Sequence, residues 1–129
     1  MPREVVLDAS ALLALVHGEE GAEVVGASIP GAQISAVNLA EVVGKLADVG
    51  MPAAEIHVAL AGLGLRVVDF DETLAFAAGL LRPVTRSAGL SLGDRACLAL
   101  AAATKLPALT ADRSWAEVVL EDAAVELIR

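Results

Sequence analysis

The sequence predicts an α/β fold, a three-layer α/β/α sandwich around a central, mostly parallel sheet of about five strands. Short apolar runs alternate along the chain with longer stretches in which apolar residues recur at helical spacing. Hydrophobic residues make up 57% of the 129 positions and aromatic residues only 2%. A core of small aliphatic side chains, packed between helices and a buried parallel sheet, fits this composition.

The apolar runs predict five strands. They lie at residues 4–7, 33–36, 65–69, 107–110 and 124–128. Each run is separated from the next by at least one helical segment or turn, so successive strands are expected to form parallel β–α–β units. No linker, internal repeat or low-complexity tract interrupts the pattern, and we expect one domain over residues 1–129.

Helices are expected at residues 9–17, 19–28, 37–49, 52–63, 71–85 and 91–103, with a short one after Asp112. Gly18 and Gly50 are placed to end helices, and Pro52 can start one. Asp71 is expected to cap the helix that follows it. The helix at 91–103 has no polar side chain from Ala96 to Ala103, which predicts burial on nearly all sides.

Charge and composition exclude some function classes. The net charge of −8 argues against a broad basic face for nucleic acid, although a bound cation can supply positive charge locally. No apolar run reaches the roughly 18–20 residues that cross a bilayer, and residues 1–4 lack the layout of a secretory signal. The single cysteine, Cys97, is expected to be a core residue. These features favour a cytoplasmic protein without a membrane segment.

Two acids follow strands directly, which points to a site at one edge of the sheet. Asp8 comes immediately after the first strand, and Asp112 lies two residues past the strand at 107–110. Parallel α/β sheets bind ligands at the carboxyl ends of their strands. We therefore expect these carboxylates to share an edge.

Four acids stand out, and each also has a purely structural interpretation. Asp8 can cap the helix at 9–17, and Asp112 the short helix that carries Trp115. Asp94 fits the S-x-x-[DE] capping box that begins at Ser91. Glu41 can form an exposed i,i+4 ion pair on its helix. Taken singly, none of them establishes a site.

Taken together, the acids occur in four segments with characteristic order and spacing. The segments are DAS at residues 8–10, SAVNLAEV at 35–42, GLSLGDRACLAL at 89–100 and LTADRSW at 109–115. In these segments, which span nearly the whole chain, the sequence resembles the PIN-domain ribonucleases, and most closely the VapC toxins of VapBC toxin–antitoxin pairs. The last two segments are the most specific; the first would match many α/β folds.

The resemblance implies an endoribonuclease in which Asp8, Glu41, Asp94 and Asp112 hold Mg²⁺ or Mn²⁺. It implies supporting roles for three polar residues: Ser10, Asn38 and Thr110. Arg86 and Arg95 are less regular in the family and are assigned to substrate phosphates. It also implies RNA as substrate, a VapB-type antitoxin as partner, and a homodimer or a toxin–antitoxin hetero-oligomer.

The chemistry agrees with this assignment. Two carboxylates about 4 Å apart repel by about 4 kcal/mol at an effective dielectric constant of 20, so converging acids take up protons or recruit a cation. Carboxylate oxygens suit Mg²⁺ or Mn²⁺, whereas zinc prefers His and Cys. His17 and His57 lie in separate helical segments and offer no zinc site. A cation here can lower the pKa of a bound water and orient a phosphodiester.

Three other functions are consistent with parts of the sequence. A phosphoaspartyl hydrolase could use Asp8 as nucleophile, but Ser10 stands where a partner acid is needed. A receiver-type module would use Asp69 or Asp71 as acceptor. It would also need an acidic pair after the first strand, where this sequence has only Asp8. A non-catalytic scaffold that binds RNA or protein would keep the fold without needing the acids. Trp115 can either stack on an RNA base or close the 110–112 loop against the core.

Overall fold

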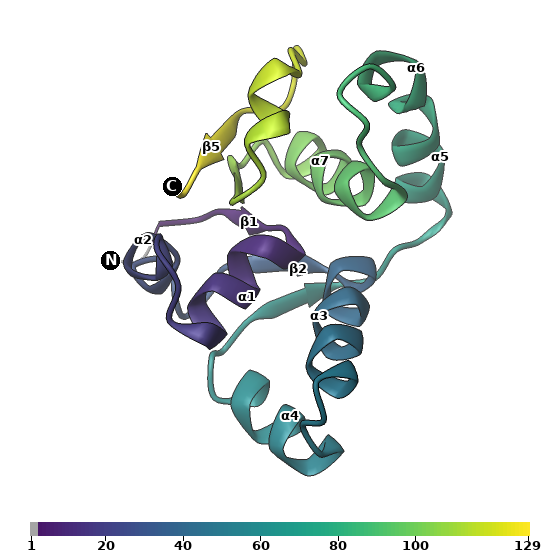
Figure 1. Ribbon diagram of the computed structural model, residues 1–129. Coiled ribbons are helices and arrows are strands. Elements are labelled where there is room, and N and C mark those ends of the chain that lie inside the picture. Colours follow the sequence, from purple (N-terminus) through teal and green to yellow (C-terminus); the bar gives the residue numbers. More distant parts are fainter. Residues whose placement is uncertain (1–2) are drawn as a thin grey trace.

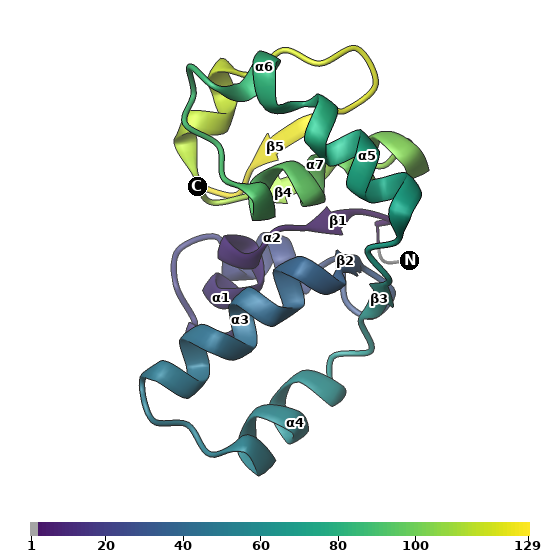
Figure 2. The ribbon, with the colours of Figure 1, turned by 90° about the vertical axis from the view of Figure 1, so that its right-hand side faces the viewer.

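In the computed structural model, which describes residues 3–129, five short strands form one sheet (Figures 1 and 2). Their order is β3-β2-β1-β4-β5, and every neighbouring pair is parallel. The strands are β1 (Val6–Leu7), β2 (Gln33–Ser35), β3 (Arg66–Val68), β4 (Ala108–Thr110) and β5 (Val125–Leu127). The predicted fold class and all five strands are confirmed.

Seven α-helices and one 3₁₀ helix are found in residues 3–129. They are α1 (Ala9–His17), α2 (Ala22–Gly26), α3 (Ala36–Asp48), α4 (Ala53–Ala61), α5 (Glu72–Leu80), α6 (Arg82–Thr85), α7 (Leu92–Thr104) and the 3₁₀ helix η1 (Arg113–Glu117). No helix within these residues is long and apolar enough to cross a membrane.

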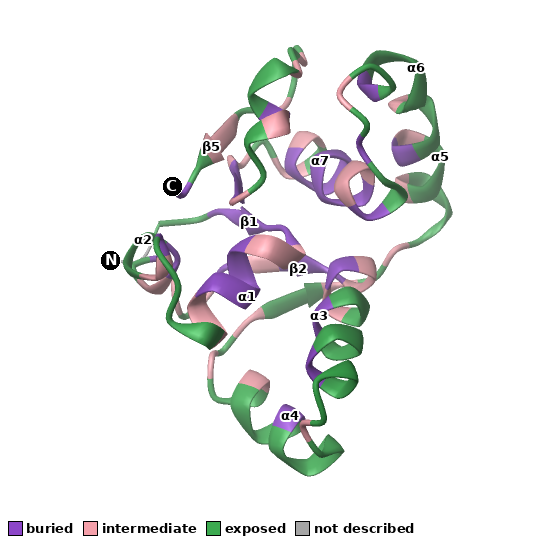
Figure 3. Cartoon of the chain, viewed as in Figure 1, coloured by how far each residue is buried: buried purple, intermediate pink, exposed green. Residues whose placement is uncertain are grey.

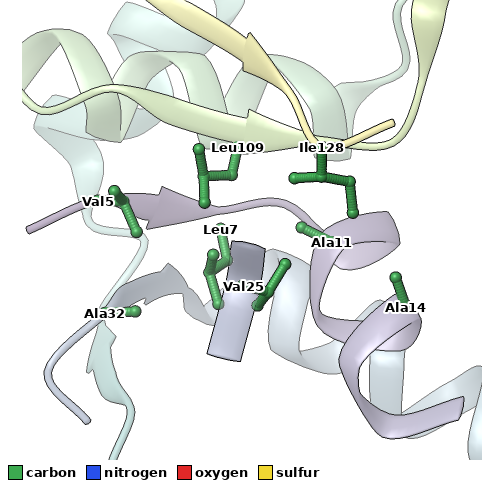
Figure 4. Close-up of a cluster of buried hydrophobic side chains, with 8 residues drawn as sticks. All are labelled: Val5, Leu7, Ala11, Ala14, Val25, Ala32, Leu109 and Ile128. Atoms are coloured by element: carbon green, nitrogen blue, oxygen red, sulfur yellow. The ribbon is translucent and has the colours of Figure 1, made fainter. Parts of the chain in front are cut away.

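Strand β1 shows why the fold has three layers. Val5, Val6 and Leu7 are all fully buried, although their side chains alternate between the two faces of the sheet. Leu7 packs in a cluster with α1 and α2, shown in Figure 4, whereas Val6 packs in a cluster with α7. Because both faces are covered, the central strand consists only of apolar residues.

The helix α7 is the most buried helix of the structure (Figure 3). From Ala96 to Ala101 no residue is more than 2% exposed, because α7 lies between the central strands, α3 and α5. Its alanines let these neighbours approach closely. Cys97 is fully buried in this helix, as expected for a core residue.

Two helices differ from their predicted bounds. The helix expected at 71–85 divides at Leu81 into α5 and α6, because Pro83 lies in the first turn of α6 and has no N–H to continue the α5 hydrogen-bond ladder. The helix expected at 19–28 shrinks to α2. Gly21, with φ of 96°, takes a left-handed conformation that a helix cannot continue through, so α2 begins after it.

The packing of β1 predicts a large loss of stability on truncation there. Leu7→Ala should lower the free energy of unfolding by about 2–5 kcal/mol, because it leaves a cavity between the sheet and α1. Val119, which is 91% exposed, provides the control. Val119→Ala should change the free energy of unfolding by less than about 0.5 kcal/mol. Urea unfolding followed by circular dichroism measures both, and equal effects would contradict the assigned core.

Candidate active site

A cavity of about 450 Å³ opens at the carboxyl ends of β1 and β4, and all four predicted acids line it. Asp8 and Asp112 come from the ends of the two strands. Glu41 comes from the second turn of α3 and Asp94 from the first turn of α7. The structure therefore brings together side chains that are 18 to 104 positions apart in the chain.

Asp8 is held by donors on both sides of its carboxylate. As the N-cap of α1 it accepts a hydrogen bond from the Ala11 N–H at 2.8 Å. The Ser10 hydroxyl donates to Oδ1 at 2.7 Å, and the Thr110 hydroxyl donates to Oδ2 at 2.6 Å. The capping prediction is confirmed, and the side chain still belongs to the cavity.

The hydroxyl groups of Ser10 and Thr110 also connect the end of β1 with the end of β4. The Ser10 oxygen accepts from the Ala111 N–H at 2.9 Å, and the Thr110 oxygen accepts from the Asp112 N–H at 3.0 Å. Each hydroxyl thus accepts from the loop after β4 while donating to Asp8. Ser10 and Thr110 fix the loop that carries Asp112 relative to Asp8.

Glu41 has a different partner from the one its helical spacing suggested. Its Oε1 accepts a hydrogen bond from Asn38 Nδ2 at 2.9 Å. The ion pairs found within residues 3–129 are Arg3–Glu126 and Arg129–Glu19, so the alternative of a Glu41–Lys45 pair is wrong. Asn38 is fully buried and also donates to the Gly93 carbonyl at 2.9 Å.

Asp94 and Asp112 each act as a capping residue. Asp94 Oδ2 accepts from the Ser91 N–H at 2.9 Å, and the Ser91 hydroxyl accepts from the Asp94 N–H at 3.2 Å, which is the predicted capping box. Asp112 Oδ1 accepts from the N–H and the hydroxyl of Ser114 at 2.9 and 2.7 Å. In each of these two acids one carboxylate oxygen accepts the hydrogen bonds, and the other oxygen has no donor among residues 3–129.

The acids act electrostatically on the same region of α7. Burial raises the pKa of Asp8 to about 6, its three hydrogen bonds oppose the shift, and the charge of Asp94 adds to it. Burial also raises the pKa of the Cys97 thiol well above its usual value, with further contributions from Asp8, Asp94 and Glu41. The charges of three of the four carboxylates therefore reach the same residue of the buried helix.

The donor set fits a hard divalent cation. None of the four acids has a basic partner within 4 Å among residues 3–129, so no ion pair of the described chain neutralises them. Carboxylate and hydroxyl oxygens are the ligands that Mg²⁺ and Mn²⁺ prefer. In the described part of the chain, no three His, Cys, Asp or Glu side chains are already close enough together to hold one ion.

The cavity also has basic residues that sequence reasoning did not assign to it: His17, Lys45 and Arg129. Arg129 is fixed by Glu19 at 3.3 Å and by the Glu20 carbonyl at 2.9 Å. Lys45 lies one turn after Glu41 on α3, and this spacing was the available signal for it. No sequence pattern connects Arg129 with the acids.

The predicted arginines and Trp115 lie outside the cavity lining. Arg95 is partly buried, and its guanidinium donates to the Ala78 carbonyl of α5 at 3.1 Å. Arg86 is exposed directly after α6. Trp115 is fully buried in the α7 cluster, so it closes the loop against the core and cannot stack on a base.

With this geometry established, comparison with known families assigns the fold. The family model of the PIN domain matches residues 5–120. The chain belongs to the PIN domain family. No curated protein sequence matches it significantly.

Solved structures of PIN proteins resemble the chain over nearly its full length. VapBC from Salmonella typhimurium, crystallised bound to DNA, has a TM-score of 0.74 and 18% identity and covers 100% of both chains. The Mycobacterium tuberculosis toxin VapC20, described as cleaving the sarcin–ricin loop, has a TM-score of 0.72 and 22% identity and covers 89% of this chain and 96% of its own. VapBC2 from Rickettsia felis has a TM-score of 0.73 and 16% identity, and the match covers 96% of this chain and 98% of its own.

The raised pKa of Asp8 predicts a pH dependence of stability in the metal-free protein. In the unfolded chain Asp8 loses its proton near its usual pKa of 3.8, whereas the folded protein keeps the proton until about pH 6. Between these values the folded state binds more protons. The free energy of unfolding therefore falls as the pH rises through this window, by roughly 3 kcal/mol in total.

Urea unfolding with EDTA at pH 4.5 and 7.5 measures this effect. Asp8→Asn should reduce the difference between the two pH values and should be more stable than the wild type at pH 7.5. If both proteins lose the same stability between the two pH values, Asp8 does not titrate in this window.

Proposed function

We propose that this protein is a metal-dependent endoribonuclease and the toxin component of a type II toxin–antitoxin system. The observation that carries the proposal is the cavity in which a PIN fold gathers Asp8, Glu41, Asp94 and Asp112, none of which forms an ion pair within residues 3–129. Mg²⁺ or Mn²⁺ would be held by these acids. The alternative of a non-catalytic scaffold gives no reason for keeping four carboxylates without ion-pair partners at one place.

When bound, the ion would lower the pKa of a water molecule and offset charge at the scissile phosphate. The residues of the chain would hold and orient the reactants. Asp8 accepts hydrogen bonds from Ser10, Thr110 and the Ala11 N–H, more donors than any other of the four acids has, and would set the ion's position. Within residues 3–129, Asp94 and Asp112 each keep one oxygen free of protein donors and are suited to bind the ion or to accept the water's proton.

Substrate phosphates need positive groups, and the structure offers two sets. Lys45 and Arg129 line the cavity itself. Arg86 and Arg95, assigned from the family resemblance, lie outside it, and Arg95 already donates to Ala78. We propose that Lys45 and Arg129 contact the phosphates next to the cleaved bond, with Arg86 and Arg95 serving at most a longer RNA.

The proposed partner is a VapB-type antitoxin. Solved structures that resemble this chain include toxin–antitoxin complexes, among them one from Klebsiella pneumoniae with a TM-score of 0.72 and 20% identity. A basic side chain of such a partner would be attracted to the acids of the cavity. A homodimer or hetero-oligomer and a cytoplasmic location are part of the same proposal.

Metal binding tests the proposal directly. Titration calorimetry with Mn²⁺ should give saturable binding to the wild type, and Asp8→Asn and Asp94→Asn should each weaken it at least tenfold and abolish RNA cleavage. Asp71 gives a matched control. It is also an N-cap that accepts from the backbone, through Leu74 N–H at 2.9 Å, but it lies outside the cavity.

The control separates loss of a cap from loss of a ligand. Asp71→Asn should leave Mn²⁺ affinity and cleavage unchanged. Equal losses in Asp71→Asn and Asp8→Asn would show that the effects come from destabilised helices. A folded wild type that binds no Mn²⁺ would contradict the metal-dependent mechanism, and the scaffold would then be the better account.

The two sets of basic residues can be distinguished by steady-state kinetics. Lys45→Ala and Arg129→Ala should each raise KM for RNA severalfold while leaving Mn²⁺ affinity within twofold, because they neutralise phosphates and not the ion. Arg86→Ala should have a smaller effect on KM for a short RNA. The reverse order of effects would assign the phosphate contacts to Arg86 and Arg95.

A further inference from the structure

Gly93, in the first turn of α7, lies against the carboxylate of Glu41. A Cβ atom placed on Gly93 would overlap the carboxyl carbon and both oxygens of this side chain. Of the eleven glycines in the sequence, all of which the structure describes, Gly93 is the one whose Cβ would meet an acidic group. The space of a missing side chain is thus filled by one of the four acids of the cavity.

The backbone at Gly93 does not need glycine. Its φ is not in the left-handed range, unlike that of Gly18 or Gly89, and it lies inside a regular helix. Glycine disfavours a helix relative to alanine because it loses more backbone entropy. The residue also stands in an otherwise alanine-rich helix. The local conformation therefore gives no reason for glycine here, and the contact with Glu41 does.

Asn38 stabilises the contact between Gly93 and Glu41. Its Nδ2 donates to Glu41 Oε1 and to the Gly93 carbonyl, both at 2.9 Å. Both partners are acceptors, so this end of the side chain must be the NH₂ group. Asn38 is fully buried, and it joins α3 to the start of α7 at the place where the two helices meet.

We propose that Gly93 is a positioning residue: its bare backbone provides the seat for the Glu41 carboxylate, and Asn38 holds the carboxylate in that seat. The seat places Glu41 against the residue that precedes Asp94, so the acids of α3 and α7 become neighbours. A side chain at position 93 would force Glu41 out toward solvent or push α3 away from α7. The consequence for metal binding rests on the proposed function; the seat itself does not.

Gly93→Ala tests the seat, and Gly44→Ala is the matched control. Gly44 lies on α3 three residues after Glu41, is exposed, and has nothing within 4 Å of the position of its Cβ. Gly44→Ala should raise Tm and leave Mn²⁺ affinity within twofold. Gly93→Ala should raise Tm by less than Gly44→Ala does, because it displaces the Glu41 carboxylate from its bond with Asn38, and it should weaken Mn²⁺ binding at least tenfold in titration calorimetry.

Gly93→Ala in a Glu41→Ala background shows whether the Glu41 carboxylate causes the effect of Gly93→Ala on Tm. With the seat empty, Gly93→Ala should raise Tm as Gly44→Ala does, so the gain in Tm from one methyl group at position 93 should be larger when residue 41 is alanine. This comparison remains informative if Gly93→Ala alone folds poorly. The inference is overturned if Gly93→Ala changes Tm equally in both backgrounds, or if it binds Mn²⁺ as tightly as the wild type.

The two proposals fail in different ways. A wild type that binds Mn²⁺ but does not cleave RNA would contradict the nuclease proposal, and the Mn²⁺ comparison would still decide the role of Gly93. A wild type that binds no Mn²⁺ would remove the metal-dependent function. The difference between the Tm effects of Gly93→Ala in the two backgrounds would then decide alone whether Gly93 seats Glu41.

Discussion

The site depends on one constraint: carboxylates that meet at the edge of an apolar sheet must be held by groups that do not neutralise them. Asp8 shows how this is achieved. It is 3% exposed, yet it receives hydrogen bonds from one backbone N–H and two hydroxyl groups and no ion pair. Hydrogen bonds fix a carboxylate while leaving its charge available, whereas a salt bridge would cancel it. The short strands, the helix starts and the loop after β4 are arranged to supply these donors.

Three of the four acids are at once helix caps and members of the cavity. This double role follows from geometry, because parallel strands end and helices begin at the same edge of the sheet. A helix N-terminus needs a side-chain oxygen that accepts from its free N–H groups, and a cation site at the same edge of the sheet also needs oxygen ligands. The structural and functional interpretations of Asp8, Asp94 and Asp112 therefore do not compete. Glu41, which caps nothing, needs a separate device, and Asn38 and Gly93 provide it.

The family resemblance assigns the four acids to one site, and it also assigns Arg86 and Arg95, which lie outside the cavity. The fold itself follows from short-range signals in the sequence. The strand after residue 4, the capping box at Ser91 and the alternation of strands with helices each lie within a few positions of the chain. The sequence does not predict the partner of Glu41, since that depends on how α3 and α7 cross. Lys45 satisfied the i,i+4 rule, but Asn38, one turn earlier, lies on the buried side of α3 and reaches the carboxylate instead. Arg129 enters the cavity only because β5 pairs with β4.

The acids weaken the fold that supports them, and the core beneath them offsets this. A buried Asp8 with a raised pKa destabilises the folded state at neutral pH, and the nearby charge of Asp94 adds to the effect. The residues directly before Asp8 are the fully buried Val5, Val6 and Leu7, and the residues after Asp94 are the buried face of α7. The most apolar segments of the chain thus carry its least favourable charges. Because a cation at the cavity would relieve the repulsion without altering that core, we expect Asp8, which lowers the stability of the free protein at neutral pH, to contribute to its stability when the ion binds.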